Sequence, residues 1–212
     1  MRKLIFGKKY VQPLSFIFDI GLNTTTNGTV KRTTDHKGGN TAIQFGSGNL
    51  VSVDNLPASP VWSVAFWLKT SSTANTIMFE LSPLLNTING FISTINNDGS
   101  GKIRCYINGG DTISANHKYT NNAFNNGVWN HVVIILDRNK TATNEVEIYI
   151  NKVKQLLTSS LNNDQTGNFT SEKIYIGGRG KTFTSPLNGA TSPFKLYNYS
   201  LTQTEIDNLY NE

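Results

Sequence analysis

Residues 128–153, VWNHVVIILDRNKTATNEVEIYINKV, decide the fold class of this chain of 212 residues. The part from 128 to 137 is nearly all apolar in its middle, which predicts a strand covered on both faces. In the part from 145 to 150, EVEIYI, every second residue is aliphatic, which predicts a strand with one face toward a core. Asn151 and Lys152 then predict a tight turn between the second strand and the next one. The segment therefore predicts antiparallel β-structure.

The same alternation recurs along the chain in about a dozen segments that are separated by polar turns. No helical period appears before residue 202. Parallel strands need long crossover connections, which are usually helices, and the pattern shows none, so we expect antiparallel sheets. The length suits one domain, because β-sandwiches commonly reach roughly 200–250 residues as single units.

The last residues, LTQTEIDNLY at 201–210, have the pattern of one short helix. Thr202 is placed as the N-cap, and Glu205 stands three residues later, where it completes a capping box. Ile206, Leu209 and Tyr210 then fall on one apolar stripe. A helix of about two turns is not stable alone in water, so we expect this stripe to lie against an apolar surface.

The chain is basic, with a formal charge of +5 and an isoelectric point near 9.3. Basic residues cluster in the first nine positions and at Lys31 and Arg32, but no nucleic-acid-binding motif appears. We therefore expect a solvated basic surface and no nucleic-acid partner. Residues 1–13 are expected to form either a basic assembly arm that faces an acidic partner or a first edge strand. Residues 14–212 are expected to form the domain.

The amino terminus and the cysteine content bear on localisation. The apolar run of residues 4–6 is shorter than the roughly 7–15 positions of a signal peptide, and no stretch is long enough to span a membrane. We expect a soluble virion or cytoplasmic protein, or an extracellular one exported without a signal peptide, and no membrane insertion. The single cysteine, Cys105, excludes an internal disulfide. It shares a strand face with Ile103 and Ile107, which predicts a small buried side chain.

Several short phrases occur along the chain in a particular order. They are Phe45-Gly46, Phe66-Trp67, Trp129-Asn130-His131-Val132, Tyr149-Ile150-Asn151, Gly177-Gly178, Leu187-Asn188-Gly189, Tyr197-Asn198 and the helix start at 201–206. In this order, over about residues 13–212, the chain resembles the laminin-G-like domains of the concanavalin A-like lectin/glucanase superfamily. The resemblance implies an all-β, two-sheet antiparallel β-sandwich jelly roll with a short C-terminal helix on the outside of one sheet.

Trp129 and His131 have two interpretations. They stand two apart on one predicted strand face, which could form a platform for a sugar ring with a polar group beside it. The family resemblance instead implies that both are framework residues, which anchor the start of the strand.

The same fold occurs in glucanases, which carry Glu-x-Asp-x-Glu on one strand, and this chain has no such triplet. The nearest approach is Glu145 and Glu147, which we interpret as surface acids. No Gly-x-Ser-x-Gly, His-Glu-x-x-His or Cys-x-x-Cys pattern occurs, and His36, His117 and His131 have no ligand spacing. We predict no catalysis, and a glycoside hydrolase with unusual acids is the alternative.

Calcium is a further question that the resemblance raises, because many family members hold one Ca²⁺. They use an early Asp and acids in a late Gly-x-Ile-Asp-Asp phrase. Asp19 stands at the early position, but the late phrase reads GATSP at 189–193, with no acid. Calcium affinity depends on carboxylate ligands. We expect no cofactor, with a weak Ca²⁺ site at Asp19 as the alternative.

Two long polar loops are predicted as the ligand site, because loops carry function on sandwich scaffolds. They span residues 108–127 and 177–189, and whether they meet is left open. The candidate ligand-binding residues are Asp111, Asn116, His117, Tyr119 and Asn121 in the first loop, and Arg179, Lys181 and Phe183 in the second.

The leading functional hypothesis is a non-catalytic module for carbohydrate binding or adhesion, with a glycan or cell-surface polysaccharide as its partner. The alternative is a structural virion protein, namely a phage head-fibre, decoration or tail-fibre domain. In that case residues 1–13 would contact other virion proteins, and the chain could form an oligomer. The two hypotheses are compatible, because a fibre tip can bind host glycans.

Overall fold

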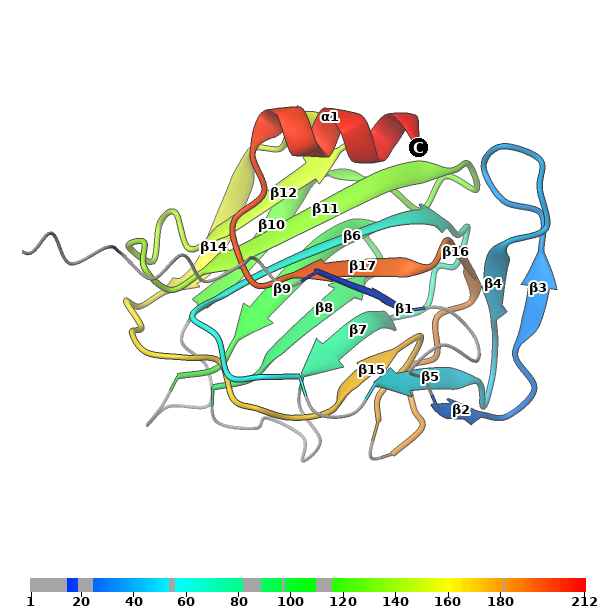
Figure 1. Ribbon diagram of the computed structural model, residues 1–212, viewed down its shortest axis with the longest axis horizontal. Coiled ribbons are helices and arrows are strands. Elements are labelled where there is room, and N and C mark those ends of the chain that lie inside the picture. The colour runs from blue at the N-terminus through cyan, green and yellow to red at the C-terminus, as the bar shows by residue number, and fades with distance from the viewer. Residues whose placement is uncertain are drawn as a thin grey trace, which may run out of the picture.

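The computed structural model describes residues 15–18, 25–53, 56–81, 89–96, 98–109, 116–180 and 182–212. Two sheets face each other, and every pairing between the described strands is antiparallel (Figure 1). One sheet has nine strands and the other has eight. The predicted all-β, two-sheet antiparallel sandwich is confirmed. Asp19, Asp111, Lys181 and residues 1–13 lie outside the described residues.

The nine-stranded sheet has the order β13-β12-β11-β6-β16-β4-β3, and β17 also pairs with β6 and with β1. The two strands predicted within residues 128–153 are β11 and β12. They pair antiparallel and align Ile134 with Ile148. The strands are β1 (Ser15–Phe18), β3 (Lys31–Thr33), β4 (Ala42–Phe45), β6 (Val61–Lys69), β11 (Asn130–Asp137), β12 (Val146–Ile150), β13 (Val153–Lys154), β16 (Gly189–Thr191) and β17 (Phe194–Tyr197).

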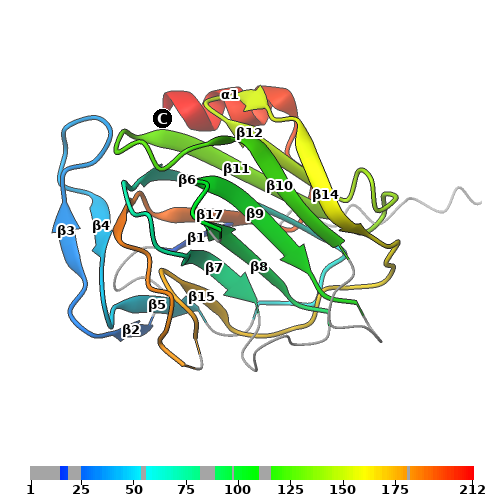
Figure 2. The same ribbon diagram turned by 180° about the vertical axis from the view of Figure 1, so that it is seen from behind.

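The eight-stranded sheet has the order β14-β10-β9-β8-β7-β15-β5-β2. Figure 2 shows this sheet in front of the other one. Its strands are β2 (Thr25–Asn27), β5 (Leu50–Val53), β7 (Thr76–Leu81), β8 (Phe91–Ile95), β9 (Lys102–Ile107), β10 (Asn116–Ala123), β14 (Leu157–Asn162) and β15 (Ile174–Ile176).

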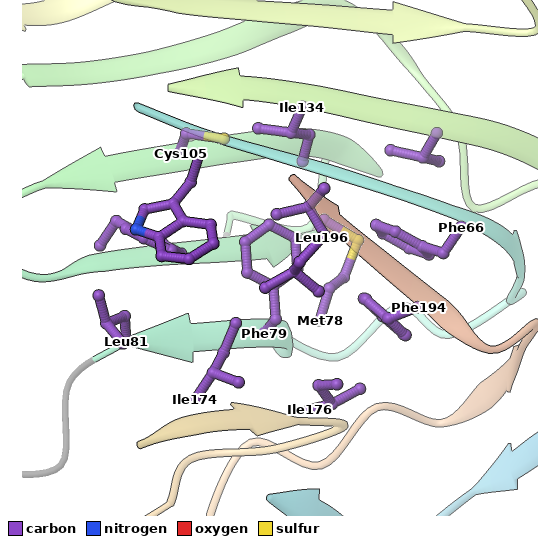
Figure 3. Close-up of a cluster of buried hydrophobic side chains, with 14 of the residues drawn as sticks. Phe66, Met78, Phe79, Leu81, Cys105, Ile134, Ile174, Ile176, Phe194 and Leu196 are labelled. Carbon is purple, nitrogen blue, oxygen red and sulfur yellow. The ribbon is translucent and has the colours of Figure 1, made fainter. Parts of the chain in front are cut away.

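The main core lies between the two sheets and is rich in aromatic side chains. Phe66 stacks on Phe194 with their ring centroids 4.2 Å apart, and Phe79 meets both rings edge to face (Figure 3). Cys105 belongs to this core, as predicted, and burial raises the pKa of its thiol to about 12. Such a thiol stays protonated at neutral pH and is not a nucleophile.

The predicted C-terminal helix is confirmed as α1 (Gln203–Asn211), with Thr202 and Glu205 forming the capping box. It packs on the outer face of the nine-stranded sheet, over β11 and β12 (Figures 1 and 2). A second apolar cluster fills this contact and comprises Ala65, Val133, Ile135, Tyr149, Leu201, Ile206 and Leu209. Among the described residues, no helix is both long and apolar enough to cross a membrane.

The structure corrects the first predicted loop, because much of residues 108–127 is strand β10. This strand lacks the apolar alternation that sequence analysis relies on, since its inward side chains are polar. Asn116, Lys118 and Thr120 are all buried. Each has a hydrogen-bonding partner: Asn116 donates to Glu145 Oε2 at 2.9 Å, and Lys118 donates to Ser159 Oγ at 2.6 Å. Thr120 Oγ1 donates to a backbone carbonyl.

Candidate functional site

An open groove of about 760 Å³ lies on the outer face of the nine-stranded sheet, where β6 ends. Leu68 belongs to the core, so Lys69 next to it points outward, and Gln44 points outward between two core residues of β4. Most of the lining consists of hydroxyl and amide side chains. They are Thr33, Thr34, Gln44, Thr70, Ser71, Ser72, Thr73 and Asn188.

The floor of the groove is open because β16 carries two small residues, Gly189 and Ala190. Ala190 is aligned with Gln44 on one side and with Lys69 on the other. A Cβ atom at Gly189 would lie 2.4 Å from the Lys69 carbonyl oxygen, so only glycine allows this close approach of β16 to β6. Gln44 Nε2 donates to the Gly189 carbonyl at 3.0 Å and thereby ties β4 to the floor.

One wall of the groove is the segment that follows β6, residues 70–74, and backbone groups hold it in place. Thr70 Oγ1 donates to the Asn188 carbonyl at 2.7 Å, and the Gly127 amide donates to the Thr70 carbonyl at 2.9 Å. The hydroxyls of Ser71 and Thr73 are exposed and make no hydrogen bond within the described part of the chain. The wall is therefore fixed, and these two hydroxyls are available to a ligand.

Trp129 lines the groove and belongs to a group of rings that continues toward α1. His36 stacks on Trp67 with centroids 4.0 Å apart and meets the Trp129 ring edge on at 6.5 Å. Trp67 in turn contacts His131 at 5.2 Å and Tyr210 of the helix at 5.1 Å. This aromatic group supports Trp129 from one side and leaves it half-buried, with part of the indole in the groove.

Trp129 and His131 differ in their surroundings in the structure: His131 is buried, and Trp129 lines the groove. His131 is 2 % exposed, and burial lowers the pKa of its imidazole to about 4. It packs between Trp67 and Tyr210, as the family resemblance implied for a framework residue. Trp129 instead lines the groove, and its use as a sugar platform stays a prediction.

The sequence-predicted residues His117 and Tyr119 lie elsewhere, on the outer face of β10 in the eight-stranded sheet. Together with three residues of β9 they form what we call the tyrosine surface: Lys102, Arg104, Tyr106, His117 and Tyr119. The His117 and Tyr106 rings lie 4.5 Å apart, and the Arg104 guanidinium lies 4.9 Å from the Tyr119 ring centroid. Asn121, near the end of the same strand, is exposed and accepts from Thr158 Oγ1 at 2.8 Å.

Asn116 is the sequence-predicted site residue that the structure removes from the surface. It is fully buried and donates to the Ala142 carbonyl at 2.7 Å and to Glu145. Its side chain therefore connects the two sheets and is not a ligand contact.

Arg179 and Phe183 lie on the segment after β15, which folds over the outer face of the eight-stranded sheet. The Arg179 guanidinium lies 3.4 Å from Glu80, and the Gly180 amide donates to the same carboxylate at 2.6 Å. Glu80 is fully buried, and burial raises the pKa of its carboxyl. Phe183 is 48 % exposed.

His117 and Tyr119 of the first predicted ligand segment therefore share one sheet face with Arg179 of the second, whereas the ends of both segments, at Gly127, Asn188 and Gly189, line the groove. Glu80, Ile92, Tyr106 and His117 are aligned in one row across neighbouring strands. Glu80, which pairs with Arg179, lies three strands away from His117 in this row. Three strand spacings correspond to about 14 Å between their Cα atoms. This face is opposite to the groove, and none of the described candidate ligand-binding residues of the two loops lines the groove.

The structure also corrects the interpretation of Glu145 as a surface acid. Glu145 is 1 % exposed, lies 3.6 Å from the Arg138 guanidinium and has a raised pKa because of burial. Glu147 is partly exposed and pairs with Lys140 and Lys154 at 3.0 and 3.1 Å. Among the described residues, no group of three or more His, Cys, Asp or Glu could hold a metal ion.

Comparison with known proteins places these features in context. The pattern of the Concanavalin A-like lectin/glucanases superfamily matches residues 37–207. A search of curated proteins found no match. Similar solved structures include domain 4 of AbnA, a GH43 extracellular arabinanase from Geobacillus stearothermophilus, in complex with arabinotriose. Its TM-score is 0.62 at 18% identity, over 93% of this chain and 87% of that one.

Two further solved structures show the same fold in other settings. A SAP-like pentraxin from Limulus polyphemus has a TM-score of 0.59 at 16% identity, over 89% of this chain and 82% of that chain. The binding domain of botulinum neurotoxin DC, in complex with SialylT, has a TM-score of 0.61 at 13% identity. The alignment covers 89% of this chain and 46% of that one. At these identities the likeness concerns the fold alone.

Proposed function

The chain belongs to the Concanavalin A-like lectin/glucanases superfamily, and we propose that it is a non-catalytic module that binds carbohydrate in the groove beside Trp129. The observation that carries this proposal is the composition of the groove. One aromatic side chain stands among eight hydroxyl and amide side chains on a fixed backbone.

The groove has the two kinds of group that a sugar requires. The hydroxyls of a sugar need donors and acceptors, and Ser, Thr, Asn and Gln side chains supply both. The CH groups of a sugar ring are apolar and favour contact with the flat face of an indole, because that contact removes both surfaces from water. Because Ser71 and Thr73 make no side-chain hydrogen bond to any described residue, a ligand can bond to them without breaking a described contact.

Similar structures support a carbohydrate ligand in general terms. The arabinanase domain was solved with arabinotriose, and the neurotoxin binding domain was solved with SialylT. Their low sequence identity means that neither ligand is carried over to this chain. The position of the groove rests on this structure alone.

The absence of catalysis is part of the proposal, and the arrangement of acids supports it. Retaining glycosidases need two carboxylates about 5–5.5 Å apart at the scissile bond. The described lining of the groove contains no Asp or Glu. The acids nearest to the glucanase pattern, Glu145 and Glu147, are both held in ion pairs. A polysaccharide that the wild-type chain cleaves, and that Glu145→Gln does not, would contradict this part.

The test compares the two faces of the sandwich with one glycan array. The protein, Trp129→Ala and Tyr119→Ala are each applied to the array, and affinities for the glycans that bind are measured by calorimetry. We expect Trp129→Ala to weaken binding about tenfold or more, since a buried aromatic contact contributes roughly 1–3 kcal/mol. Tyr119→Ala should change affinity less than about twofold, because Tyr119 lies on the opposite sheet.

Thermal unfolding of each variant shows whether it is folded, and Trp129→Phe tests whether a smaller ring restores part of the affinity. If Tyr119→Ala loses binding and Trp129→Ala keeps it, the site is the tyrosine surface and the proposal for the groove is wrong. If the folded wild-type chain binds no glycan on the array, the carbohydrate function is contradicted. The virion role and an assembly arm at residues 1–13 stay predictions, which sizing the chain with and without those residues would check.

A further inference from the structure

Resting on the proposed carbohydrate site, we infer that the groove selects glycans that carry negative charge, as carboxylates or as sulfate esters on the sugar rings. The observation behind this inference is a row of aligned residues across four neighbouring strands. Lys31 on β3 is aligned with Gln44 on β4, Gln44 with Ala190 on β16, and Ala190 with Lys69 on β6. The row thus has a lysine at each end and a small residue on its floor. Lys69 lines the groove, and Lys31 lies beside it, two residues before the lining residue Thr33.

Both lysines are available to a ligand. Each is exposed, and neither makes a hydrogen bond or ion pair within the described part of the chain. The other exposed lysines that the structure describes have partners: Lys154 pairs with Glu147 at 3.1 Å, and Lys37 donates to the Asn211 carbonyl at 3.2 Å. An ammonium group without a partner loses no protein contact when it binds an anion.

The two lysines mark the length of the site. Successive strands in a sheet lie about 4.8 Å apart, so the Cα atoms of Lys31 and Lys69 are separated by three spacings, about 14 Å. Figure 1 shows β3, β4, β16 and β6 in this order at one end of the sandwich. The spacing suits a chain of several sugar rings with more than one charged ring, and not a single monosaccharide.

No acid in the described lining opposes these charges. The acid nearest in sequence is Asp35, which follows Thr34, and its carboxylate is already engaged. It accepts hydrogen bonds from the amides of Lys37, Gly39 and Thr41 and from the Thr41 hydroxyl. Asp35 keeps its negative charge but does not line the groove, so the charged side chain in the described lining is that of Lys69. An anionic ligand is therefore attracted there and a cationic ligand is repelled.

Lysine suits either kind of anion, because its ammonium group acts as a compact point charge with three donors that rotate freely. The groove is open to solvent, so salt will screen the attraction. The inference therefore predicts an affinity that falls with ionic strength for charged glycans and stays nearly constant for neutral ones.

The experiment uses two pairs of probes that differ only in charge. One pair is an oligogalacturonate and its methyl ester, and the other is a sulfated dextran and unmodified dextran of the same length. Calorimetry at low and physiological salt compares the wild-type chain with Lys69→Gln, Lys31→Gln and the double variant. Lys102→Gln is the control, because it removes the same charge from the tyrosine surface on the other sheet.

We expect the charged member of at least one pair to bind more tightly than its neutral partner at low salt, and the preferred pair identifies the anion. Lys69→Gln should weaken binding of that probe about tenfold, since it removes a charge-assisted hydrogen bond to the anion. The double variant should lose most of the salt dependence, and Lys102→Gln should match the wild-type chain.

Equal binding of the charged and neutral members, or no binding of either charged probe, would overturn the inference. So would a loss of affinity in Lys102→Gln as large as that in Lys69→Gln. The proposed function fails separately: if Trp129→Ala leaves binding of every array ligand unchanged, the groove is not the carbohydrate site. If Trp129→Ala abolishes binding but the lysine variants do not affect it, the site stands and its preference for charge is wrong.

Discussion

His131 illustrates how a single residue connects the fold to its stability. It lies between Trp67 and Tyr210, and its ring is almost completely buried. Burial is the largest cause that lowers its pKa from 6.5 to about 4, and the neighbouring His36 and Lys195 lower it further. Glu212 acts in the opposite direction. The folded chain therefore favours the neutral imidazole.

This shift predicts how stability changes with pH. Because the pKa of His131 is lower in the folded state, its contribution to stability is complete above the pKa of the unfolded chain, near 6.5. This contribution is lost as the pH falls toward 4, the pKa in the folded state. The loss amounts to at most about 3 kcal/mol. Urea unfolding at pH 7.5 and pH 4 should show a smaller difference for His131→Phe than for the wild-type chain. His36 is present in both proteins, so the comparison measures the contribution of His131 together with its coupling to His36. An equal difference in both proteins would contradict the prediction.

Other residues show where inference from sequence ends. The alternation at 145–150 correctly placed Ile148 inward, but it also placed Glu145 outward, on the assumption that the second face is wet. Glu145 is buried because Arg138 and Asn116 approach it from other segments. The sequence carries no local signal of this pairing, since Arg138 looks like an ordinary turn residue after a strand.

At the scale of elements, α1 was predictable almost in full from LTQTEIDNLY, because capping boxes and apolar stripes are local patterns. Strand β10 was not predictable, because its inward side chains are polar and are satisfied only by distant partners such as Ser159 and Glu145. The groove could not be predicted either. Its lining comes from residues 33, 34, 44, 69–74, 127, 129 and 188–190, and only the fold brings these segments together. The one local signal was Trp129, which allowed a sugar platform as an alternative interpretation.

The packing of α1 leads to a test at this scale. Ile206 is completely buried against the nine-stranded sheet, whereas Thr204 on the same helix is exposed. Ile206→Ala should lower the free energy of unfolding by about 2–5 kcal/mol, because it removes transfer energy and leaves a cavity. Thr204→Ala should change it by less than about 0.5 kcal/mol. Urea denaturation of both variants checks this, and similar values would show that the helix does not depend on its apolar stripe.

At the scale of the whole molecule, the two outer faces of the sandwich differ in what they offer. The face of the nine-stranded sheet carries α1, the aromatic group and the groove. The face of the eight-stranded sheet carries the tyrosine surface, where Arg104 already stacks on Tyr119. The net charge of +5 fits a chain that approaches an anionic polymer, and in our account Lys69 in the groove and Lys31 beside it direct this attraction.

The central claim is that carbohydrate binds in the groove beside Trp129, and the indole N–H signals of the protein test it most directly. The chain has three tryptophans: Trp62 is buried in the core, Trp67 lies in the aromatic group and Trp129 lines the groove. In a ¹⁵N NMR titration with an oligosaccharide that binds, the account predicts that the Trp129 signal moves most and the Trp62 signal stays in place. Movement confined to the amides of His117 and Tyr119, with all three indole signals unchanged, would contradict it.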